Sequence, residues 1–277
     1  MKRCYIIPKI TSDIVKYLKG VFEELNIPGY NEKVGVGVIR HIVIRSSYKF
    51  DDISVTIVTL TPKLPKKEII VKKLVSRYDR VVSVVHNFNP DNTNIILGKK
   101  SKILFGEDFI RDEINGVYFK ISHRSFYQVN PAQTEDLYRK AIEYADLEAN
   151  EVIIDAYCGI GTIGLSAAKY AKTVLGVDVV KSAISDAMEN ARNNNITNAK
   201  FVAGKAEEVI LQWKNYDVDV MFIDPPRKGC DKVFLETVVQ MKIPRIVYIS
   251  CNVSTLARDL NYLQSQGYEV IEVTPFD

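Results

Sequence analysis

The sequence is poor in cysteine and histidine, and it has no long apolar run. Its four cysteines and three histidines form no CxxC pair and no regular spacing, which argues against a disulfide framework or a self-contained zinc site. No apolar stretch approaches the roughly 18 residues of a membrane span. The basic start is cut short by Pro8 and Lys9, so it lacks the apolar region of a signal peptide. We therefore expect a cytoplasmic protein without a bound metal or a membrane partner.

The rest of the composition is that of a globular protein, with 47% hydrophobic and 26% charged residues, and 277 residues suggest about two domains. The net charge of +3 hides an asymmetry. Up to Ser122 there are 21 Lys and Arg against 13 Asp and Glu, a charge of +8, whereas the remainder has 16 against 21, a charge of −5. A basic half suggests a polyanionic partner, although a solvated lysine-rich surface gives the same count.

Residues 1–122 read as a smaller mixed α+β domain. Apolar residues repeat with helical spacing from Asp13 to Leu25, and a second, basic helix is predicted over 66–78. Strands are predicted over 36–45, 53–60, 80–86, 94–97 and 117–122, with a charged loop between the last two.

Residues 123–277 alternate between short apolar runs and helical stretches, which predicts an α/β domain with a parallel sheet. The expected strands are 152–155, 173–178, 200–202, 218–224, 246–250 and 269–273. The expected helices are 162–170, 182–194, 231–241 and 254–266. Ligands of such sheets bind at the carboxyl ends of the strands.

A glycine-rich segment stands at the first of these strand ends. Gly159, Gly161 and Gly164 form G-x-G-x-x-G between a strand and a helix, and Asp178 ends the next strand, where a carboxylate can accept ribose hydroxyls. This pattern fits NAD as well as S-adenosylmethionine (SAM). Asp155, just ahead of the glycines, favours SAM, because it attracts a cationic methionine end and repels a pyrophosphate.

Two further polar segments follow later strands. Asp-Pro-Pro-Arg-Lys-Gly occupies 224–229, and Ser-Cys-Asn occupies 250–252, so Asp224, Arg227 and Cys251 should converge on the cofactor. A free cysteine is usually a small buried hydrophobe. The position of Cys251 at a strand end, between two polar residues, favours a reactive thiol instead.

With these motifs, and with Ser-Phe-Tyr-Gln-Val-Asn-Pro at 125–131 and Ile-Arg-His-x-x-x-Arg at 39–45, the chain resembles the RNA uracil-5-methyltransferase family. The resemblance implies a Rossmann-like class I SAM methyltransferase domain over 123–277, preceded by a central RNA-facing domain over 1–122. It implies methyl transfer from SAM to C5 of a uridine in RNA. We expect a monomer acting on 23S ribosomal RNA, ahead of transfer RNA.

The chemistry explains why a cysteine is needed. Uracil C5 is a poor nucleophile, but addition of a thiolate to C6 makes the ring an enolate whose C5 can attack the methyl group. Cys251 is the expected nucleophile, and positive charge from Arg227 or from the helix beginning near Ser254 favours its thiolate. A general base must then remove the C5 proton.

The resemblance also implies the roles of other residues. The expected SAM contacts are Gln128, Tyr157, Gly159, Gly161, Asp178 and Asp224. Asp224 is also expected to act in catalysis, by hydrogen-bonding the uracil. The expected RNA contacts are Arg227, Arg40, His41 and Arg45. Simpler interpretations remain open: Gln128 could belong to a turn that Pro131 closes, and Tyr157 could pack in the core.

The chain departs from the family pattern at both ends. The family's catalytic Glu follows Thr-Pro-Phe-Asp, with which this sequence ends at Asp277, and the OB-like TRAM domain of many members is absent. Cys4 resembles the last ligand of an iron–sulfur site found in some members, but one cysteine cannot hold a cluster. We therefore expect an incomplete catalytic unit that binds SAM, turns over poorly and accumulates a Cys251 adduct.

Three other functions stay open at this point. A noncatalytic RNA-binding module could keep a SAM fold. An amino-group methyltransferase also uses Asp-Pro-Pro, but with an aromatic residue where Arg227 stands. An NAD dehydrogenase ranks third.

Overall fold

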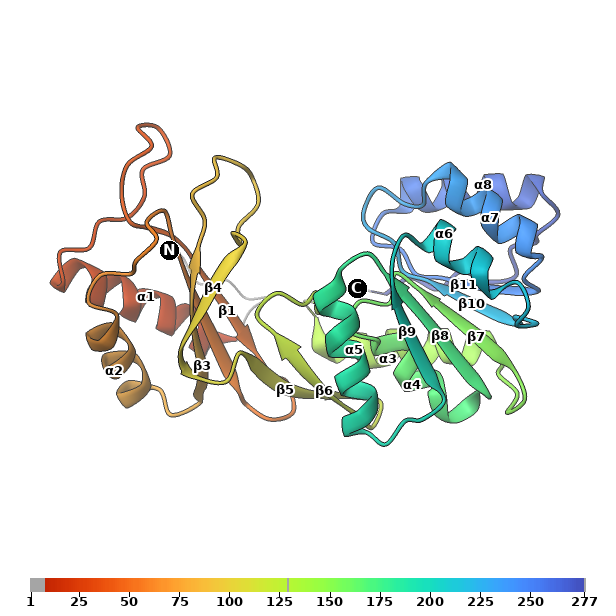
Figure 1. The fold of residues 1–277 in the computed structure, drawn as a ribbon, viewed down its shortest axis with the longest axis horizontal. Helices are drawn as coiled ribbons and strands as arrows, with labels where there is room; N and C mark the ends of the chain where they lie inside the picture. Colours follow the sequence, from red (N-terminus) through yellow and green to blue (C-terminus); the bar gives the residue numbers. More distant parts are fainter. Residues whose placement is uncertain (1–7, 129, 277) are drawn as a thin grey trace. The chain divides into compact units, whose positions relative to one another are not determined.

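The computed structural model describes residues 8–128 and 130–276, so Cys4, Val129 and Asp277 lie outside the described residues. The chain divides into two compact units (Figure 1). Unit 1 comprises residues 8–112 with Lys120–Arg124, and unit 2 comprises Glu113–Phe119 with 125–276. Ser122, after which the sequence predicts a domain boundary, lies in unit 1, and one hairpin contributes residues to both units.

Unit 1 is a four-stranded sheet with two helices packed against it. The strands are β1 (Ile39–Ser46), β2 (Ile53–Thr59), β3 (Val81–Phe88) and β4 (Lys100–Gly106), paired in the order β1-β2-β3-β4. The helices are α1 (Lys9–Glu24) and α2 (Lys67–Arg77). Ile14 and Leu18 of α1 and Leu74 of α2 are fully buried in one core with the β2 residues Ile53, Val55 and Ile57. The predicted mixed α+β domain is therefore present.

The prediction for residues 94–97 is wrong, because this stretch is a loop. The side-chain amide of Asn89 donates to the backbone oxygens of Ile95 and Ile96, at 2.7 and 2.9 Å, so these carbonyls are bonded to a side chain rather than to a strand. The predicted charged loop instead contains β4 and β5 (Phe109–Ile114), and β5 pairs with β6 (Val117–Ser122) in a hairpin.

Unit 2 is a five-stranded sheet in the order β11-β10-β7-β8-β9, and each of its four ladders is parallel. The strands are β7 (Val152–Ala156), β8 (Thr173–Asp178), β9 (Ala199–Ala203), β10 (Val220–Ile223) and β11 (Arg245–Tyr248). The helices are α3 (Pro131–Ala145), α4 (Thr162–Ala167), α5 (Lys181–Asn193), α6 (Ala206–Val209), α7 (Lys232–Met241) and α8 (Val253–Ser265), with short 3-10 turns at Ala168–Tyr170 and Ile210–Trp213. This is a Rossmann-like α/β fold, as the sequence predicts.

Three elements of unit 2 differ from the prediction. Neither helix α3 nor the short helix α6 is predicted by the sequence. The predicted strand over 269–273 is wrong: the segment has no ladder partner among the described residues, and Ile271 is 84% exposed. A β-branched sequence becomes a strand only where a sheet edge pairs with it.

The strand order places a topological switch point in the middle of the sheet. From β7 the chain continues to β8 on one side, while β10 pairs with β7 on the other (Figure 1). Residues Ala156, Ile223 and Tyr248 are in register, so the loops after β7, β10 and β11 leave the sheet side by side. Ligands of open α/β sheets bind at such a point. Within the described residues, no helix has both the length and the apolar character needed to cross a membrane.

Candidate active site

The glycine turn after β7 is held from inside by Asp155. The backbone N–H of Gly164 donates to Asp155 Oδ2 at 2.7 Å, and the carboxyl group is fully buried. A Cβ added to Gly164 would lie 2.8 Å from the same oxygen, so a side chain does not fit there. Gly159 and Gly161 have φ of +55° and +84°, in the left-handed region that glycine adopts without strain. The turn therefore requires its glycines.

Burial also makes Asp155 an unusual acid. Desolvation, followed by the negative charges of Asp224 and Asp178, raises its pKa to about 7, against the opposing effect of the Gly164 N–H. Its second oxygen, Oδ1, has no hydrogen-bond partner among the described residues. A buried acceptor without a partner is costly, and a cationic ligand nearby would compensate part of this cost.

Asp178 joins the end of β8 to the same turn. Its Oδ2 accepts from the Gly159 N–H at 3.0 Å, and its Oδ1 accepts from the Val180 N–H at 2.8 Å. The next two residues lie at the surface: Val179 is 63% exposed and Val180 is 50% exposed. A carboxylate oxygen can accept more than one hydrogen bond, so Asp178 can still accept from ribose hydroxyls at the surface.

Tyr157 combines a strained backbone with a packed ring. Its φ is +62°, and its ring lies 5.2 Å from that of Phe234 on α7. Burial, followed by the nearby Cys230 thiol, raises the pKa of its hydroxyl. The ring of Tyr157 therefore packs in the core, as the simpler interpretation expects, and the SAM contact of Tyr157 stays a prediction.

Gln128 and Asp224, 96 residues apart in sequence, meet in unit 2. Gln128 Nε2 lies 3.5 Å from Asp224 Oδ2, and burial raises the pKa of Asp224 to about 6. Tyr138 of α3 is buried, and its hydroxyl is hydrogen-bonded to Gln128 and Thr162. Burial, followed by the negative charge of Asp224, raises the pKa of this hydroxyl. Tyr138 was missed because α3 was missed, although Pro131 at its first turn is a typical helix start.

Cys251 is exposed, whereas Cys158 and Cys230 are buried. It stands two residues before α8, whose N-cap is Asn252: the Asn252 side chain accepts from the Ser254 N–H at 3.0 Å. Ser250 Oγ accepts from the Asn252 N–H at 3.1 Å, which closes the turn around the cysteine. The thiol is accessible beside a helix N-terminus, where the backbone dipoles favour negative charge.

The loop after β10 contacts this turn through Arg227. The backbone oxygen of Arg227 accepts from Asn252 Nδ2 and from Thr255 Oγ1, both at 3.4 Å. The Arg227 side chain is exposed. The sequence thus correctly places Asp224, Arg227 and Cys251 on neighbouring loops of one sheet edge. Within the described residues, no group of three or more His, Cys, Asp or Glu could hold a metal ion.

The three predicted RNA contacts of unit 1 lie on β1 and are half-buried. Arg40 Nη1 donates to the backbone oxygens of Asn89 and Asp91, at 2.8 and 2.7 Å. Burial lowers the pKa of Arg45, and burial together with Arg40 lowers that of His41. Arg40 therefore anchors a loop in this structure, and its contact with RNA stays a prediction.

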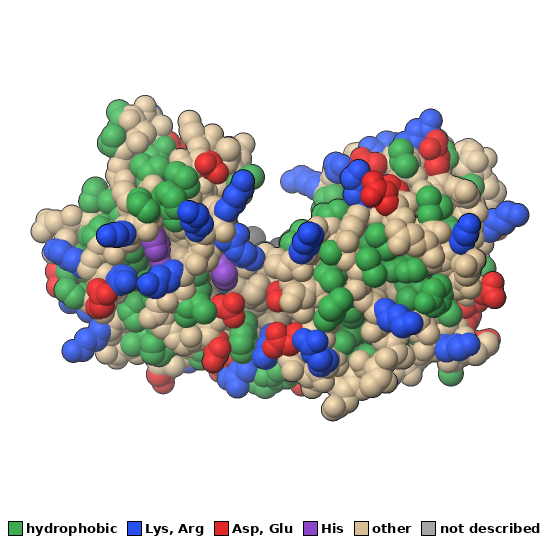
Figure 2. Space-filling view, viewed as in Figure 1, with side chains coloured by type: hydrophobic (Ala, Val, Ile, Leu, Met, Phe, Trp, Pro, Cys, Tyr) green, Lys and Arg blue, Asp and Glu red, His purple; other side chains and the backbone are tan. Residues whose placement is uncertain are grey.

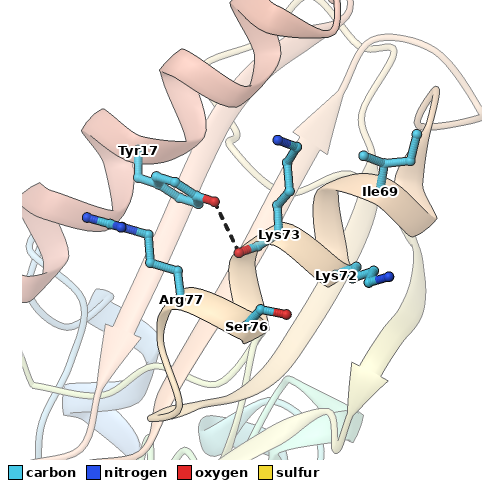
Figure 3. Close-up of a pocket in the computed structure, with 6 residues that line it drawn as sticks. All are labelled: Tyr17, Ile69, Lys72, Lys73, Ser76 and Arg77. Carbon is cyan, nitrogen blue, oxygen red and sulfur yellow. Dashed lines mark hydrogen bonds between the residues drawn. The ribbon is translucent and has the colours of Figure 1, made fainter.

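Open hollows flank the basic helix α2. One of about 770 Å³ is lined by Tyr17, Ile69, Lys72, Lys73, Ser76 and Arg77 (Figure 3), and one of about 470 Å³ includes Lys67, Lys72 and Lys102. Lys73 pairs with Glu24 at 3.0 Å, but neither Lys72 nor Arg77 pairs with a carboxylate among the described residues. Lys67 and Lys102 help to lower the pKa of His86, after burial. Figure 2 shows further Lys and Arg side chains on the surface of unit 1.

The fold and the glycine turn define the class of SAM-dependent methyltransferase folds, and comparisons with known proteins agree. The model of the tRNA (uracil-5-)-methyltransferase family matches residues 91–277. An uncharacterised RNA methyltransferase of Oceanobacillus iheyensis is 46% identical over 99% of this chain and 60% of its own length. A second one, of Staphylococcus aureus, is 46% identical over the whole chain and 61% of its own length.

Solved structures give the same result. The Pyrococcus abyssi tRNA (uracil-54, C5)-methyltransferase in complex with S-adenosyl-L-homocysteine is similar with a TM-score of 0.78 and 29% identity, over 94% of this chain and 62% of that chain. A tRNA methyltransferase of M. jannaschii, at 14% identity and a TM-score of 0.50, shares the fold alone. The chain belongs to the tRNA (uracil-5-)-methyltransferase family, and it spans about 60% of the length of the curated relatives it matches.

Proposed function

We propose that this chain transfers a methyl group from SAM to C5 of a uridine in RNA, through a covalent bond between Cys251 and C6. The observation that carries the proposal is the arrangement at the sheet edge of unit 2. There the exposed Cys251 follows strand β11, at the N-terminus of a helix. Strand β10, which leads into the loop of Asp224 and Arg227, pairs with β11 on one side and with β7, which leads into the glycine turn, on the other. The P. abyssi relative was solved with the demethylated form of SAM, which supports the cofactor.

The residues present fit SAM. A left-handed glycine turn lets a ligand approach the backbone, and at Gly159 even an added Cβ would meet nothing within 4 Å. Asp178 stands at the end of the neighbouring strand for ribose hydroxyls. Asp155 and Asp224 supply negative charge for a cationic ligand, and NAD, with its pyrophosphate, would be repelled by both. Gln128, Tyr157, Gly159, Gly161, Asp178 and Asp224 would hold the cofactor, which supplies the methyl group when bound.

The chemistry uses the neighbouring loops. The Cys251 thiolate bonds to C6, and the C5–C6 π electrons move onto O4 as an enolate. When the enolate collapses, C5 would bond to the methyl carbon as the bond between that carbon and the sulfonium sulfur breaks, and S-adenosylhomocysteine would be the leaving group. A base takes the C5 proton, and the electrons of that bond restore the double bond as the C6–S bond breaks. Asp224 would hydrogen-bond the uracil edge, and Arg227 would contact the RNA.

For the RNA, we propose that unit 1 binds phosphates. The cations of the hollows beside α2 can hold an RNA backbone without reading its sequence, and the target base must leave its stack to reach Cys251. Arg40, His41 and Arg45 would contribute from β1. We propose 23S ribosomal RNA as the substrate. Mapping of 5-methyluridine in ribosomal and transfer RNA from a deletion strain tests this, and loss in transfer RNA alone would overturn it.

The reaction is tested with tritium-labelled SAM and uridine-containing RNA on a denaturing gel. Labelled RNA, free or bound to the protein, should form with the wild type and with Cys4→Ala but not with Cys251→Ala, which should still bind SAM by calorimetry. Labelled adduct and free labelled RNA are scored separately, because the first reports bond formation at Cys251 and the second reports turnover.

Other outcomes contradict the proposal in recognisable ways. Label that persists in Cys251→Ala indicates an amino-group methyltransferase. Binding of SAM and RNA without any transfer indicates a noncatalytic module. Binding of NAD in place of SAM removes the methyltransferase proposal altogether.

A further inference from the structure

A buried carboxylate behind the reactive loops has no role in the chemistry above. Asp259 lies in the second turn of α8, and its side chain is fully buried. Its Oδ2 accepts from the backbone N–H of Cys230 at 2.8 Å and from the hydroxyl of Tyr248 at 2.7 Å. Its Oδ1 accepts from Arg258 Nε at 2.8 Å. Buried carboxylates are retained where such bonds satisfy them.

Arg258 extends this contact to the loop after β10. Its Nη2 donates to the backbone oxygens of Lys228 and Cys230, both at 3.1 Å. A Cβ added to Gly229 would lie 2.6 Å from Arg258 Nη2 and 2.6 Å from Asp259 Oδ2, and the φ of Gly229 is +76°. The loop therefore passes so close to the Arg258–Asp259 pair that only glycine fits.

The bonds of Asp259 join the segments that carry the reactive groups. Cys230 closes the loop that begins with Asp224 and Arg227. Tyr248 is the last residue of β11, three residues before Cys251, and α8 begins two residues after Cys251. The Cys230 thiol lies 3.4 Å from the Tyr248 hydroxyl, and Tyr157 of the glycine turn packs against the same core as Cys230. One cluster, built around the buried Cys230 and Asp259 with the partly buried Tyr157 and Tyr248 and the exposed Arg258, thus links all three loops.

We propose that Asp259 is a positioning residue that fixes the Cys251 turn relative to the Asp224–Arg227 loop. It touches neither substrate nor cofactor and acts through the backbone of Cys230 and the hydroxyl of Tyr248. This inference rests on the proposed function of Cys251.

The decisive variant is Asp259→Asn, which keeps the shape of the side chain but removes its charge and one acceptor oxygen. The matched control is Asp219→Asn. The Asp219 carboxylate accepts from the Val152 N–H at 2.8 Å, at the opposite end of β10, so the control removes the same kind of anchor away from the reactive loops. The gentler variant Tyr248→Phe removes one donor to Asp259 and keeps the ring.

The first measurement is the single-turnover rate of adduct formation at saturating SAM and RNA. Asp259→Asn should slow it on the order of 100-fold, because a misplacement of about 1 Å can cost that much, while SAM affinity by calorimetry stays at the wild-type value. Tyr248→Phe should slow it less, and Asp219→Asn should leave it unchanged. A wild-type rate in both Asp259→Asn and Tyr248→Phe, or an equal slowing in the control, overturns the proposal.

The second measurement needs no reaction. Amide hydrogen exchange without RNA should become faster at residues 228–230 and 251–255 in Asp259→Asn, and at neither segment in Asp219→Asn. Should Asp259→Asn not fold, Tyr248→Phe decides both measurements. If the wild type forms no adduct, the proposed function fails while exchange still tests the positioning. Exchange that is unchanged in these two segments refutes the positioning itself.

Discussion

The two units place the charges of their proposed sites in opposite environments. In unit 1, Lys72, Arg77 and Lys102 lie exposed on α2 and β4. In unit 2, Asp155 and Asp259 are fully buried, and each accepts one backbone N–H, from Gly164 in the first turn of α4 and from Cys230 in the loop after β10. An exposed cation acts on a polyanion mainly through its charge, and neighbouring cations can replace it. A buried carboxylate also sets the position of the backbone segment it binds. Substitutions that add or remove a single atom should therefore alter stability and ligand binding in unit 2, whereas unit 1 should tolerate them.

The largest contrast is expected between two glycines with similar backbone angles. Gly229 in unit 2 and Gly35 in unit 1 have φ of +76° and +69°. An alanine at either position bears the left-handed strain of about 1 kcal/mol. At Gly229 it also meets Arg258 and Asp259, whereas at Gly35 it meets nothing within 4 Å. Gly229→Ala should therefore cost about 3 kcal/mol of unfolding free energy, against about 1 kcal/mol for Gly35→Ala. Urea unfolding of the two variants measures this, and equal losses would refute the steric account.

A second pair of glycines tests the turn that Asp155 holds. Gly164→Ala places a Cβ 2.8 Å from Asp155 Oδ2 and should cost about 2 kcal/mol, with weaker SAM binding. Gly20→Ala, in helix α1 of unit 1, meets nothing within 4 Å. It should raise stability by about 1 kcal/mol, because alanine favours helix over glycine. Opposite signs in urea unfolding are expected, and a neutral Gly164→Ala would contradict the tight turn.

Much of this site could be predicted from sequence, because parallel strands bring their carboxyl ends to one edge. That rule alone places Asp224, Arg227 and Cys251 together with the glycine turn. Asp259 could not be found this way, since an acid within a helix is usually a solvated charge, and its burial depends on Gly229 and Tyr248. Ile95 and Ile96 look like part of a strand, but Asn89 binds their carbonyls. Arg40 looks like an RNA contact, yet it also binds two loop carbonyls.

The buried acids of unit 2 predict a pH dependence. The pKa of Asp155 is raised to about 7 and that of Asp224 to about 6, so both lose their protons as the pH rises from about 5 to about 8. SAM is cationic and should bind more tightly over that range, on the order of tenfold per unit of pKa change on binding. S-adenosylhomocysteine, without the sulfonium charge, should show a flatter profile. Calorimetry at several pH values measures the affinity for each of the two ligands. If the two affinities changed with pH in parallel, Asp155 and Asp224 would not be the cause of the pH dependence of SAM binding.

Asp155 also links pH to stability, with the sign opposite to that of most carboxylates. Because its pKa is raised in the folded state, the folded chain binds a proton that the unfolded chain releases. Stability from this group is therefore present at low pH and is lost as the pH rises through about 7. Asp155→Asn should flatten the slope between about pH 6 and pH 7, where Asp224, with its pKa of about 6, contributes least, and urea unfolding at several pH values measures it. The same slope in the variant would show that another group causes it.

The smallest effect is expected on the surface of unit 1. Lys72 lines both hollows beside α2, and Lys72→Ala should lower the slope of log affinity for RNA against log salt by about 1, with no change in sequence preference. Lys73→Ala is the matched control, because Lys73 is already paired with Glu24 and should contribute less. Filter binding at several salt concentrations distinguishes the two. An unchanged slope in Lys72→Ala would show that RNA phosphates bind elsewhere, because a cation in contact with a phosphate must release a counterion.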